Sequence, residues 1–472
     1  MLLKRSSCTS ILIGKKASAD GTIMIGRNED SQAAWPKHFV VHPHQDYAQP
    51  QKFIAKDTGL TLDLPQSWAK YTATPEWTNR YGLFEEDGIN EYGVAMSATE
   101  SAYSNARILG LDPLVPGGIS EAAMITIVLP FVKTAKAGVL RLGSLISDYG
   151  TCESNGILFA DHQEAWYLET AGGHQWVAQR IPDDSYAVVA NQLAIQTIDF
   201  DAPDFLTAPT LQDFCLKNRL WQPHQPFNFR EIFGTNDASD RVYNIPRVWD
   251  GQRYLSPSLA ITPNSTLNFI ETPDRPLFVE DAIAVLSRHF NETPFDPALR
   301  PQTADSQKFR PISLAKTQEA HVLQLRPEQP KGIGDLHWLA MGVAAESIFV
   351  PFYAGLTQTP ASYQIGEMTF DPQSAYWQAK QLSVLVDSHY TAFMLKLQAL
   401  QKQLFSQHLT LIDQTDTALK SAQTKTAQGA ICTRAARIAA EQTKTGMQQL
   451  YSQLLIQATD ASPLNFKTDK NL

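Results

Sequence analysis

The spacing of apolar residues along the chain changes towards its C-terminal end. Over roughly the first 350 residues, short apolar runs rich in strand-forming residues are separated by turn-forming residues. From about residue 371, apolar side chains instead recur every three or four positions, as in amphipathic helices. The pattern therefore predicts a strand-rich first part and a helical last part. The expected strands include residues 93–97, 156–160, 165–169, 186–191 and 338–343.

Helices are also expected between the strands. Residues 120–129 begin with a serine and a glutamate, which suit an N-cap and the first helical turn. Residues 136–147 and 281–289 are two further helical segments, and the second has acidic residues near its start and basic residues at its end, as the helix dipole favours. Strands interrupted by a few helices predict an α+β fold with two layers of sheet and helices outside them.

The helical last part is predicted to form long helices over residues 374–421 and 430–455. We expect these helices to pack on the main domain. The alternative is that they provide a self-association surface, which would make the protein a homo-oligomer.

Cys8 stands directly before the first predicted strand. An Asp-Gly turn signal follows this strand, and the next apolar residues form the returning strand of a hairpin. With a loop over about residues 15–20, the hairpin places Arg27 opposite Cys8 and Asp30 close by. A neighbouring cation favours the thiolate form of a cysteine, which is its nucleophilic form.

Cys8 becomes a stronger candidate nucleophile if residues 1–7 are removed. It then carries a free α-amine, whose unperturbed pKa is ~7.7–8.0, so nucleophile and general base belong to one residue. The alternative from the hairpin alone is a small buried apolar residue, because free cysteines are among the most buried residue types. A lipoprotein signal is excluded, since residues 1–7 contain no apolar stretch of ~7–15 residues.

Composition narrows the function classes. The 472 residues carry a formal net charge of -9, so the chain lacks the basic footprint of a nucleic-acid-binding protein. No uninterrupted apolar run reaches ~18 residues, so no membrane span is expected. The cysteines and histidines form no ligand motif, and no glycine-rich phosphate loop is present, so we expect neither a metal nor another cofactor. Without a signal peptide, the expected compartment is the cytosol, with reduced thiols.

Several ordered motifs point to one enzyme family. They are CTSILIGKKASADG and RNED within residues 8–30, DGINEYGVAMSATE at 87–100, EAWYLE and GHQWVA within 164–178, NQ at 191–192, YNIPRVW at 243–249 and VPFY at 350–353. Together they resemble the cysteine dipeptidases of the lactic-acid-bacterial dipeptidase A type. That family belongs to the N-terminal-nucleophile hydrolase superfamily, beside bile-salt hydrolases and penicillin V acylases.

The resemblance implies a domain organisation and a fold. Residues 1–7 would be a propeptide that the chain removes autocatalytically. Residues 8–370 would form the catalytic domain, a four-layer αββα sandwich of the α+β class. Residues 371–472 would form a C-terminal helical extension.

The resemblance also implies roles for single residues. Cys8 matches the nucleophile, and Arg27 and Asp30 match the pair beside it. Arg27 would favour the thiolate, and Asp30 would accept a hydrogen bond from the new α-amine and orient it. Asn191 matches the asparagine whose side-chain amide helps to form the oxyanion hole.

Two assignments near the site are less direct. Backbone N–H groups near Thr99 and Glu100 are expected as the second oxyanion donor, although bile-salt hydrolases carry an asparagine where Glu100 aligns. One more arginine is expected close to the nucleophile. Arg241 is the first candidate for this role and Arg247 is the second. The alternative for either residue is that it forms an ordinary surface ion pair.

The predicted reaction is hydrolysis of dipeptides through a thioester. Because a dipeptide carries an ammonium at one end and a carboxylate at the other, we expect Glu100 or Glu29 to hold the first and Arg80 or Arg247 the second. One alternative is an enzyme that cleaves N-acyl amides, such as penicillins or bile-salt conjugates. Another is an unprocessed, non-catalytic scaffold that binds partners through its helical part.

Overall fold

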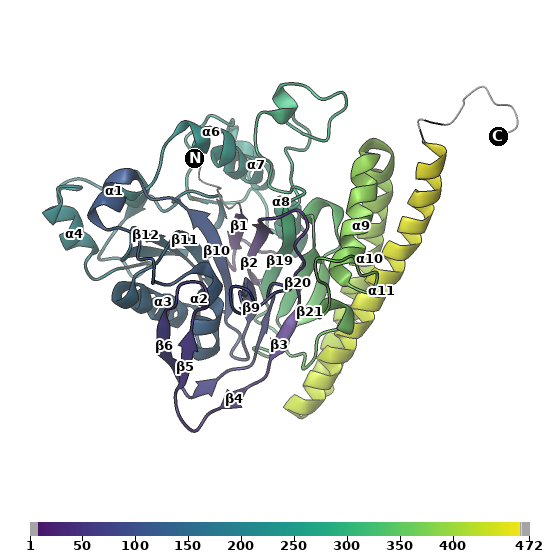
Figure 1. The fold of residues 1–472 in the computed structure, drawn as a ribbon, viewed down its shortest axis with the longest axis horizontal. Coiled ribbons are helices and arrows are strands. Elements are labelled where there is room, and N and C mark those ends of the chain that lie inside the picture. Colours follow the sequence, from purple (N-terminus) through teal and green to yellow (C-terminus); the bar gives the residue numbers. More distant parts are fainter. Residues whose placement is uncertain (1–7, 463, 465–472) are drawn as a thin grey trace, which may run out of the picture.

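The structure is a computed structural model that describes residues 8–462 and residue 464. Two large antiparallel sheets lie at its centre, and helices cover them on both sides (Figure 1). The predicted α+β class is therefore confirmed.

The larger sheet has seven strands and contains the N-terminal hairpin. In spatial order its strands are β18 (Ile270–Glu271), β14 (Tyr186–Val189), β1 (Thr9–Ile13), β2 (Ile23–Asp30), β19 (Thr317–Leu325), β20 (Leu336–Met341) and β21 (Val350–Tyr353). All neighbouring pairs run antiparallel. The strands predicted at residues 186–191 and 338–343 correspond to β14 and β20.

The second sheet has six strands. In spatial order these are β16 (Phe205–Thr207), β13 (Gln175–Ile181), β12 (Ala165–Ala171), β11 (Ser154–Ala160), β10 (Ala95–Ala102) and β9 (Asp87–Ile89). The strands predicted at residues 93–97, 156–160 and 165–169 correspond to β10, β11 and β12. The register between β10 and β11 shifts between Ala98 and Glu100, which marks a bulge in β10.

The hairpin of β1 and β2 has a register two residues away from the predicted one. Ser10, not Cys8, is the residue paired with Arg27. The loop is longer than predicted because it is bonded to the segment before β14: the backbone N–H of Lys16 donates to the carbonyl of Asp183 at 2.7 Å. An even shift keeps every side chain on its expected face of the sheet, so Arg27 still lies on the side of Cys8.

Strands β1 and β2 are buried on both faces. Leu12 and Ile25 belong to the apolar core shared with the six-stranded sheet. Ile11 and Met24 belong to a second core, which lies under the helices on the other side. Because alternate side chains of a strand point to opposite faces, Cys8 shares the face of Leu12 and points towards the six-stranded sheet.

Helices pack on the outer faces of the two sheets. Helices α2 (Glu121–Val128) and α3 (Ala135–Tyr149) pack on the six-stranded sheet, whereas α8 (Val279–Leu286) packs on β1, β2 and β19. These are the helices predicted at residues 120–129, 136–147 and 281–289.

The last part of the chain is helical, as predicted. It forms α9 (Ala375–Ser388), α10 (Tyr390–Ser421) and α11 (Lys425–Asp460), and the two longest helices lie along one edge of the molecule (Figure 1). Helix α11 packs on α9, α10 and β21. Asp416 on α10 accepts a hydrogen bond from the Tyr353 hydroxyl of β21 at 2.7 Å and pairs with Arg326. These contacts join the helices to the seven-stranded sheet.

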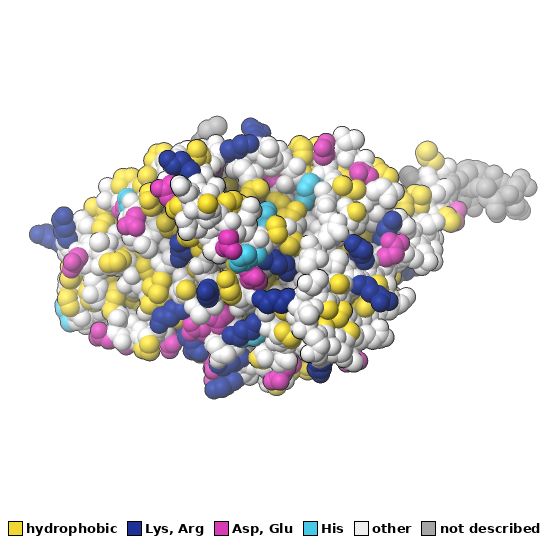
Figure 2. Space-filling view, turned by 90° about the horizontal axis from the view of Figure 1, so that it is seen from below, with side chains coloured by type: hydrophobic (Ala, Val, Ile, Leu, Met, Phe, Trp, Pro, Cys, Tyr) yellow, Lys and Arg dark blue, Asp and Glu magenta, His cyan; other side chains and the backbone are white. Residues whose placement is uncertain are grey.

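The remaining strands and α-helices are short. They are the strand pairs β3 (Val40–His42) with β8 (Tyr71–Ala73), β4 (Gln45–Asp46) with β7 (Ser67–Trp68), β5 (Gln51–Ile54) with β6 (Thr61–Leu64) and β15 (Thr197–Ile198) with β17 (Phe227–Asn228), and the helices α1 (Ala106–Leu111), α4 (Leu211–Lys217), α5 (Phe229–Phe233), α6 (Ala238–Tyr243) and α7 (Ile245–Leu255). Within the described residues, no helix combines the length and apolar character that a bilayer crossing requires. Figure 2 shows basic and acidic side chains intermixed over one face of the molecule.

Candidate active site

Cys8 lies directly before β1, and its side chain is buried. The Nη1 atom of Arg27 is 3.3 Å from the Cys8 Sγ atom, so the structure brings these two predicted residues together. Other N–H groups of Arg27 donate to the Ser97 hydroxyl at 3.0 Å, the Thr99 carbonyl at 2.9 Å and the Glu86 carboxylate at 2.6 Å. These contacts hold the guanidinium beside the sulfur.

The surroundings of the Cys8 thiol favour its neutral form. Burial raises its pKa well above the usual range, Arg27 acts in the opposite direction, and Glu100 and Asp30 add to the increase. The predicted effect of Arg27 on the thiolate is therefore present, but it is the smaller of two opposing effects. Nucleophilic chemistry at this sulfur needs a base that removes the proton.

Asp30 ends β2 and is fully buried. Its carboxylate pairs with the Arg310 guanidinium at 2.5 Å and accepts a hydrogen bond from the Thr317 hydroxyl at 2.5 Å. Burial raises the pKa of Asp30, and Arg310 opposes that increase. Sequence reasoning missed Arg310, because it lies 280 positions from Asp30 in a segment without a motif.

Asn191 follows β14 and is fully buried. Its Nδ2 atom donates to the Ser101 carbonyl at 2.9 Å, and its Oδ1 atom accepts from Arg247 Nη2 at 2.7 Å. Within the described residues, the second N–H of this amide has no hydrogen-bond acceptor. An amide held in this way can donate to an oxygen that becomes negatively charged.

Arg247, on α7, connects Asn191 to the start of β1. All five of its N–H groups are engaged by protein atoms. Their acceptors are the carbonyl oxygens of Cys8 and Tyr243 and the side-chain oxygens of Thr9, Asn191 and Asn244. No N–H of Arg247 is left for a substrate carboxylate, which was one of its two expected roles. The contacts instead suit a residue that positions Cys8 and Asn191.

The other two predicted arginines are exposed. Arg241 lies on α6 and lines a cavity of about 620 Å³ together with Gln192 and Asn236. Arg80 stacks on the ring of Tyr81. Of the two candidate arginines, Arg241 and Arg247, only Arg247 contacts Cys8 in the described structure.

Glu100 lies in β10 and is fully buried, like Thr99 before it. The Ser10 hydroxyl donates to Glu100 Oε2 at 2.6 Å. The other carboxylate oxygen, Oε1, has no hydrogen-bond partner in the part of the chain that the structure describes. Burial raises the pKa of Glu100 to about 7, against the opposing effects of Arg247 and Ser10.

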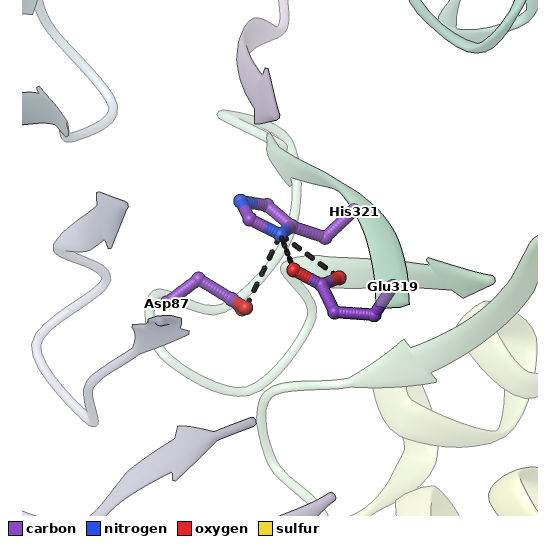
Figure 3. Close-up of side chains that lie close together, drawn as sticks. All are labelled: Asp87, Glu319 and His321. Carbon is purple, nitrogen blue, oxygen red and sulfur yellow. Dashed lines mark hydrogen bonds and ion pairs between the residues drawn. The ribbon is translucent and has the colours of Figure 1, made fainter. Parts of the chain in front are cut away.

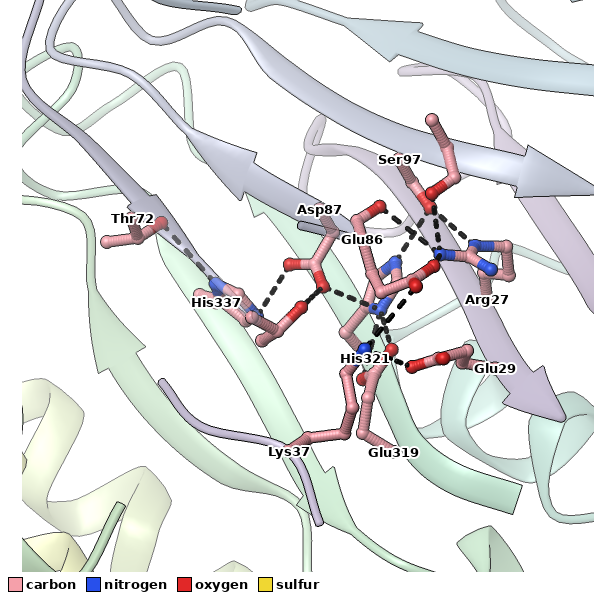
Figure 4. Close-up of polar contacts among 12 residues, drawn as sticks. Arg27, Glu29, Lys37, Thr72, Glu86, Asp87, Ser97, Glu319, His321 and His337 are labelled. Carbon is pink, nitrogen blue, oxygen red and sulfur yellow. Dashed lines mark hydrogen bonds and ion pairs between the residues drawn. The ribbon is translucent and has the colours of Figure 1, made fainter. Parts of the chain in front are cut away.

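A buried network of charged side chains lies behind Arg27 (Figure 4). The Lys37 ammonium is 2.9 Å from the Glu29 carboxylate and 3.3 Å from that of Glu86, which also pairs with Arg27. Glu29, one of the two expected ammonium receptors, is therefore already paired with a lysine. Neither Lys37 nor Glu86 was predicted, because they meet only in the folded chain.

Asp87, Glu319 and His321 lie close enough together to be considered as metal ligands (Figure 3). His321 Nδ1 is 3.0 Å from Glu319 Oε1 and 3.2 Å from Asp87 Oδ2. Burial lowers the pKa of His321, but the two carboxylates raise it by more, so they favour the protonated ring. A protonated imidazole has no lone pair for a metal ion. The residues therefore fit an ion-pair cluster, which contacts Ser97 through His321 Nε2 at 2.9 Å.

The sequence profile of peptidase family C69 matches residues 7–403. The chain belongs to this family. The matched segment contains Cys8, Arg27, Asp30, Asn191 and Arg247, and the resemblance drawn from the motifs is confirmed.

Named relatives of this C69 protein cover most or all of its length. A probable dipeptidase from Latilactobacillus sakei is 40% identical over 478 residues, which covers 100% of this chain and 99% of the relative. A probable dipeptidase B from Lactococcus lactis subsp. lactis (strain IL1403) is 42% identical over 399 residues and 83% of each chain. Dipeptidase A from Lactobacillus helveticus is 36% identical over 427 residues, which covers 89% of this chain and 90% of the relative.

The C69 match ends inside α10, so α11 lies beyond it. The relative from Latilactobacillus sakei nevertheless aligns with the whole chain, α11 included.

Proposed function

We propose that this C69 peptidase is a cysteine dipeptidase whose nucleophile is Cys8, exposed when the chain removes residues 1–7. Those seven residues lie outside the described part of the structure. The proposal rests on the contacts that two arginines make with Cys8. Arg27 lies 3.3 Å from its sulfur, and Arg247 links its carbonyl oxygen to Asn191. The names of the relatives supply the substrate class, a dipeptide.

The arrangement of layers supports the same proposal. Helices α2 and α3, the six-stranded sheet, the seven-stranded sheet and α8 follow one another in contact. We assign this order to the four-layer αββα sandwich of the N-terminal-nucleophile hydrolases, with α9, α10 and α11 as a C-terminal extension.

In the proposed mechanism the new α-amine of Cys8 is the general base. Because the buried thiol is neutral, the amine takes its proton as Sγ attacks the peptide carbonyl carbon. Arg27 stabilises the negative charge that forms on the sulfur. Asp30 accepts a hydrogen bond from the amine and orients it, while Arg310 and Thr317 hold the carboxylate in place.

The carbonyl oxygen becomes an oxyanion in this step. The second N–H of the Asn191 amide donates to it, and one such donor typically lowers the barrier by ~3–4 kcal/mol. The C–N bond then breaks, and the amine base returns its proton to the leaving amino group. Water attacks the remaining thioester with the same amine as base, which releases the acid and restores the thiol.

Intact mass spectrometry of purified wild type and Cys8→Ala tests the proposal, together with an assay of dipeptide hydrolysis. We expect the wild type to lack residues 1–7 and to be active, and Cys8→Ala to keep them and be inactive. Cys215→Ala is a matched control, because Cys215 is another buried free cysteine and lies on α4. An active Cys8→Ala protein, or a full-length wild type that hydrolyses dipeptides, would refute the mechanism.

A further inference from the structure

Two of the buried polar atoms near the nucleophile that lack hydrogen-bond partners belong to the six-stranded sheet. They are Glu100 Oε1 and the hydroxyl oxygen of Tyr167, and this holds for all residues that the structure describes. Both side chains are 0% exposed. Leaving a buried polar group unpaired costs ~1–3 kcal/mol, so most such groups in folded proteins have a partner. An acid and a hydroxyl left unpaired in one place indicate a ligand that supplies the missing donors.

Gly156 places these two groups side by side. It is the residue of β11 directly opposite Glu100 in β10. A Cβ atom on Gly156 would lie only 1.8 Å from the Tyr167 hydroxyl oxygen. Directly opposite residues of antiparallel strands have Cα atoms about 4.5–5.5 Å apart and side chains on the same face. The Tyr167 hydroxyl therefore occupies the space of a side chain at position 156, next to the Glu100 carboxylate.

Ser10 links this pair to the nucleophile. Its hydroxyl donates to Glu100 Oε2 at 2.6 Å, and it follows Cys8 by two positions, on the same face of β1. Glu100 raises the pKa of the Cys8 thiol, and both Glu100 and Cys8 raise the pKa of Tyr167. The three groups are therefore within electrostatic reach of one another.

Other acids around the site already have partners. Glu29 pairs with Lys37 at 2.9 Å. Glu169, in β12, accepts hydrogen bonds from the backbone N–H groups of Ala194 and Ile195. Glu100 differs from both, because among the described residues its Oε1 atom has neither a hydrogen bond nor an ion pair.

We propose that Glu100 Oε1 and the Tyr167 hydroxyl bind the free α-ammonium group of the peptide substrate. The inference rests on the proposed function and narrows it to peptides with an unblocked N-terminus. An ammonium group has three donors and no acceptor, so it suits a carboxylate oxygen and a hydroxyl oxygen together. In a dipeptide the ammonium is on the carbon next to the scissile carbonyl, so its receptor has to lie beside the nucleophile. The pair of Glu100 and Tyr167 meets that condition.

Steady-state kinetics of wild type, Glu100→Gln and Tyr167→Phe test the proposal with a free dipeptide and its desamino analogue. We expect each variant to raise KM for the free dipeptide tenfold or more. The loss of kcat/KM for the desamino analogue should be at least fivefold smaller than the loss for the free dipeptide. If wild type does not cleave the analogue, it is measured as an inhibitor, and its inhibition constant should be the same in all three proteins.

Tyr186→Phe is the matched control. Tyr186 is also buried in a strand, but its hydroxyl is partnered by Ser256 at 2.9 Å. Its removal should lower the melting temperature and leave the preference between the two substrates unchanged. Tyr167→Phe removes an unpaired hydroxyl and should not lower the melting temperature, which separates a role in binding from one in folding.

Two results would overturn the proposal. Equal losses on both substrates would show that Glu100 acts on Cys8 itself, and unchanged kinetics in both variants would show that the ammonium binds elsewhere. Either result leaves Cys8 as the nucleophile, whereas an active Cys8→Ala protein would refute the proposed function itself.

Discussion

At the level of single residues, lysine substitutions at Arg247 and at Arg241 should have very different effects on the kinetics. In Arg247→Lys, one ammonium replaces a planar fork and cannot hold both the Cys8 carbonyl and the Asn191 amide. We expect kcat for dipeptides to fall about 100-fold or more, as for loss of an oxyanion donor, with little change in KM. Arg241→Lys, at an exposed position, should keep wild-type kinetics. The reverse outcome in a steady-state assay would assign the arginine that supports the reaction to position 241.

The buried carboxylate of Glu100 should make the fold less stable as pH rises. Its pKa of about 7 in the folded chain is above the ~4.3 of an unfolded glutamate. The folded chain therefore holds a proton that the unfolded chain has lost, and wild-type stability decreases from about pH 4 to pH 7 and stays lower above that.

Glu100→Gln removes the part of this dependence that comes from Glu100. Relative to wild type, the substitution should increase the free energy of unfolding by on the order of 3 kcal/mol more at pH 8 than at pH 4. Urea titrations at the two pH values measure the difference, with the exposed Glu367→Gln as control. If the substitution changes the free energy of unfolding equally at both pH values, the pKa of Glu100 is not raised in the folded chain.

The same carboxylate gives substrate binding a pH dependence. Only the ionised form of Glu100 attracts an ammonium, and its pKa of about 7 means that this form grows between pH 5 and pH 8. We expect KM for a free dipeptide to decrease over that range in wild type. In Glu100→Gln, KM should vary much less with pH, and a profile parallel to wild type would count against the binding role.

At the level of elements, local pattern predicts most strands and helices but not how they pair. The run before Gly14 is readily identified as a strand because its apolar content is local. The register of the hairpin instead depends on Lys16, whose N–H bonds Asp183 of a distant segment. A Cβ atom at Gly14 would lie 2.4 Å from the Pro182 carbonyl oxygen, which is also a contact that no local pattern contains.

The residues of the site can likewise be divided into those that the local sequence brings together and those that only the fold does. Cys8, Arg27 and Asp30 could be predicted because one hairpin brings them together. Asn191 and Arg247 needed a family resemblance, since they come from separate segments. Arg310 stands in no motif, and Tyr167 stands in a motif that suggests no role for it, because their contacts form only when segments distant in the chain meet.

The contact between α10 and the sheet has a measurable effect on stability. Asp416 is mostly buried and accepts hydrogen bonds from both Arg326 and Tyr353. Asp416→Ala leaves that arginine without its carboxylate, which typically costs ~3–5 kcal/mol for a buried pair. Asp413→Ala, an exposed position of the same helix, should change the free energy of unfolding by less than about 0.5 kcal/mol. Chemical denaturation of both variants compares the two sites.

At the scale of the whole molecule, the helical part and the seven-stranded sheet share one apolar core. Cys432 and Leu454 of α11 are buried in the same cluster as Trp338 and Phe352 of the sheet. A chain that ends at residue 421 exposes that surface. We expect it to melt at a lower temperature than the full chain and to bind a dye for apolar surfaces, and an unchanged melting curve would show that the helices fold independently.

The contacts of Cys8 have a consequence for a chain that is cleaved before this residue, as we propose. The first residues of most proteins are poorly ordered unless something ties them down. Here Arg247 binds the Cys8 carbonyl, Arg27 contacts the Cys8 sulfur, and the side chain is only 3% exposed. A chain that begins at Cys8 would therefore begin with a buried residue that two arginines hold in place. Such an end should resist aminopeptidases and react slowly with amine-labelling reagents until the protein unfolds.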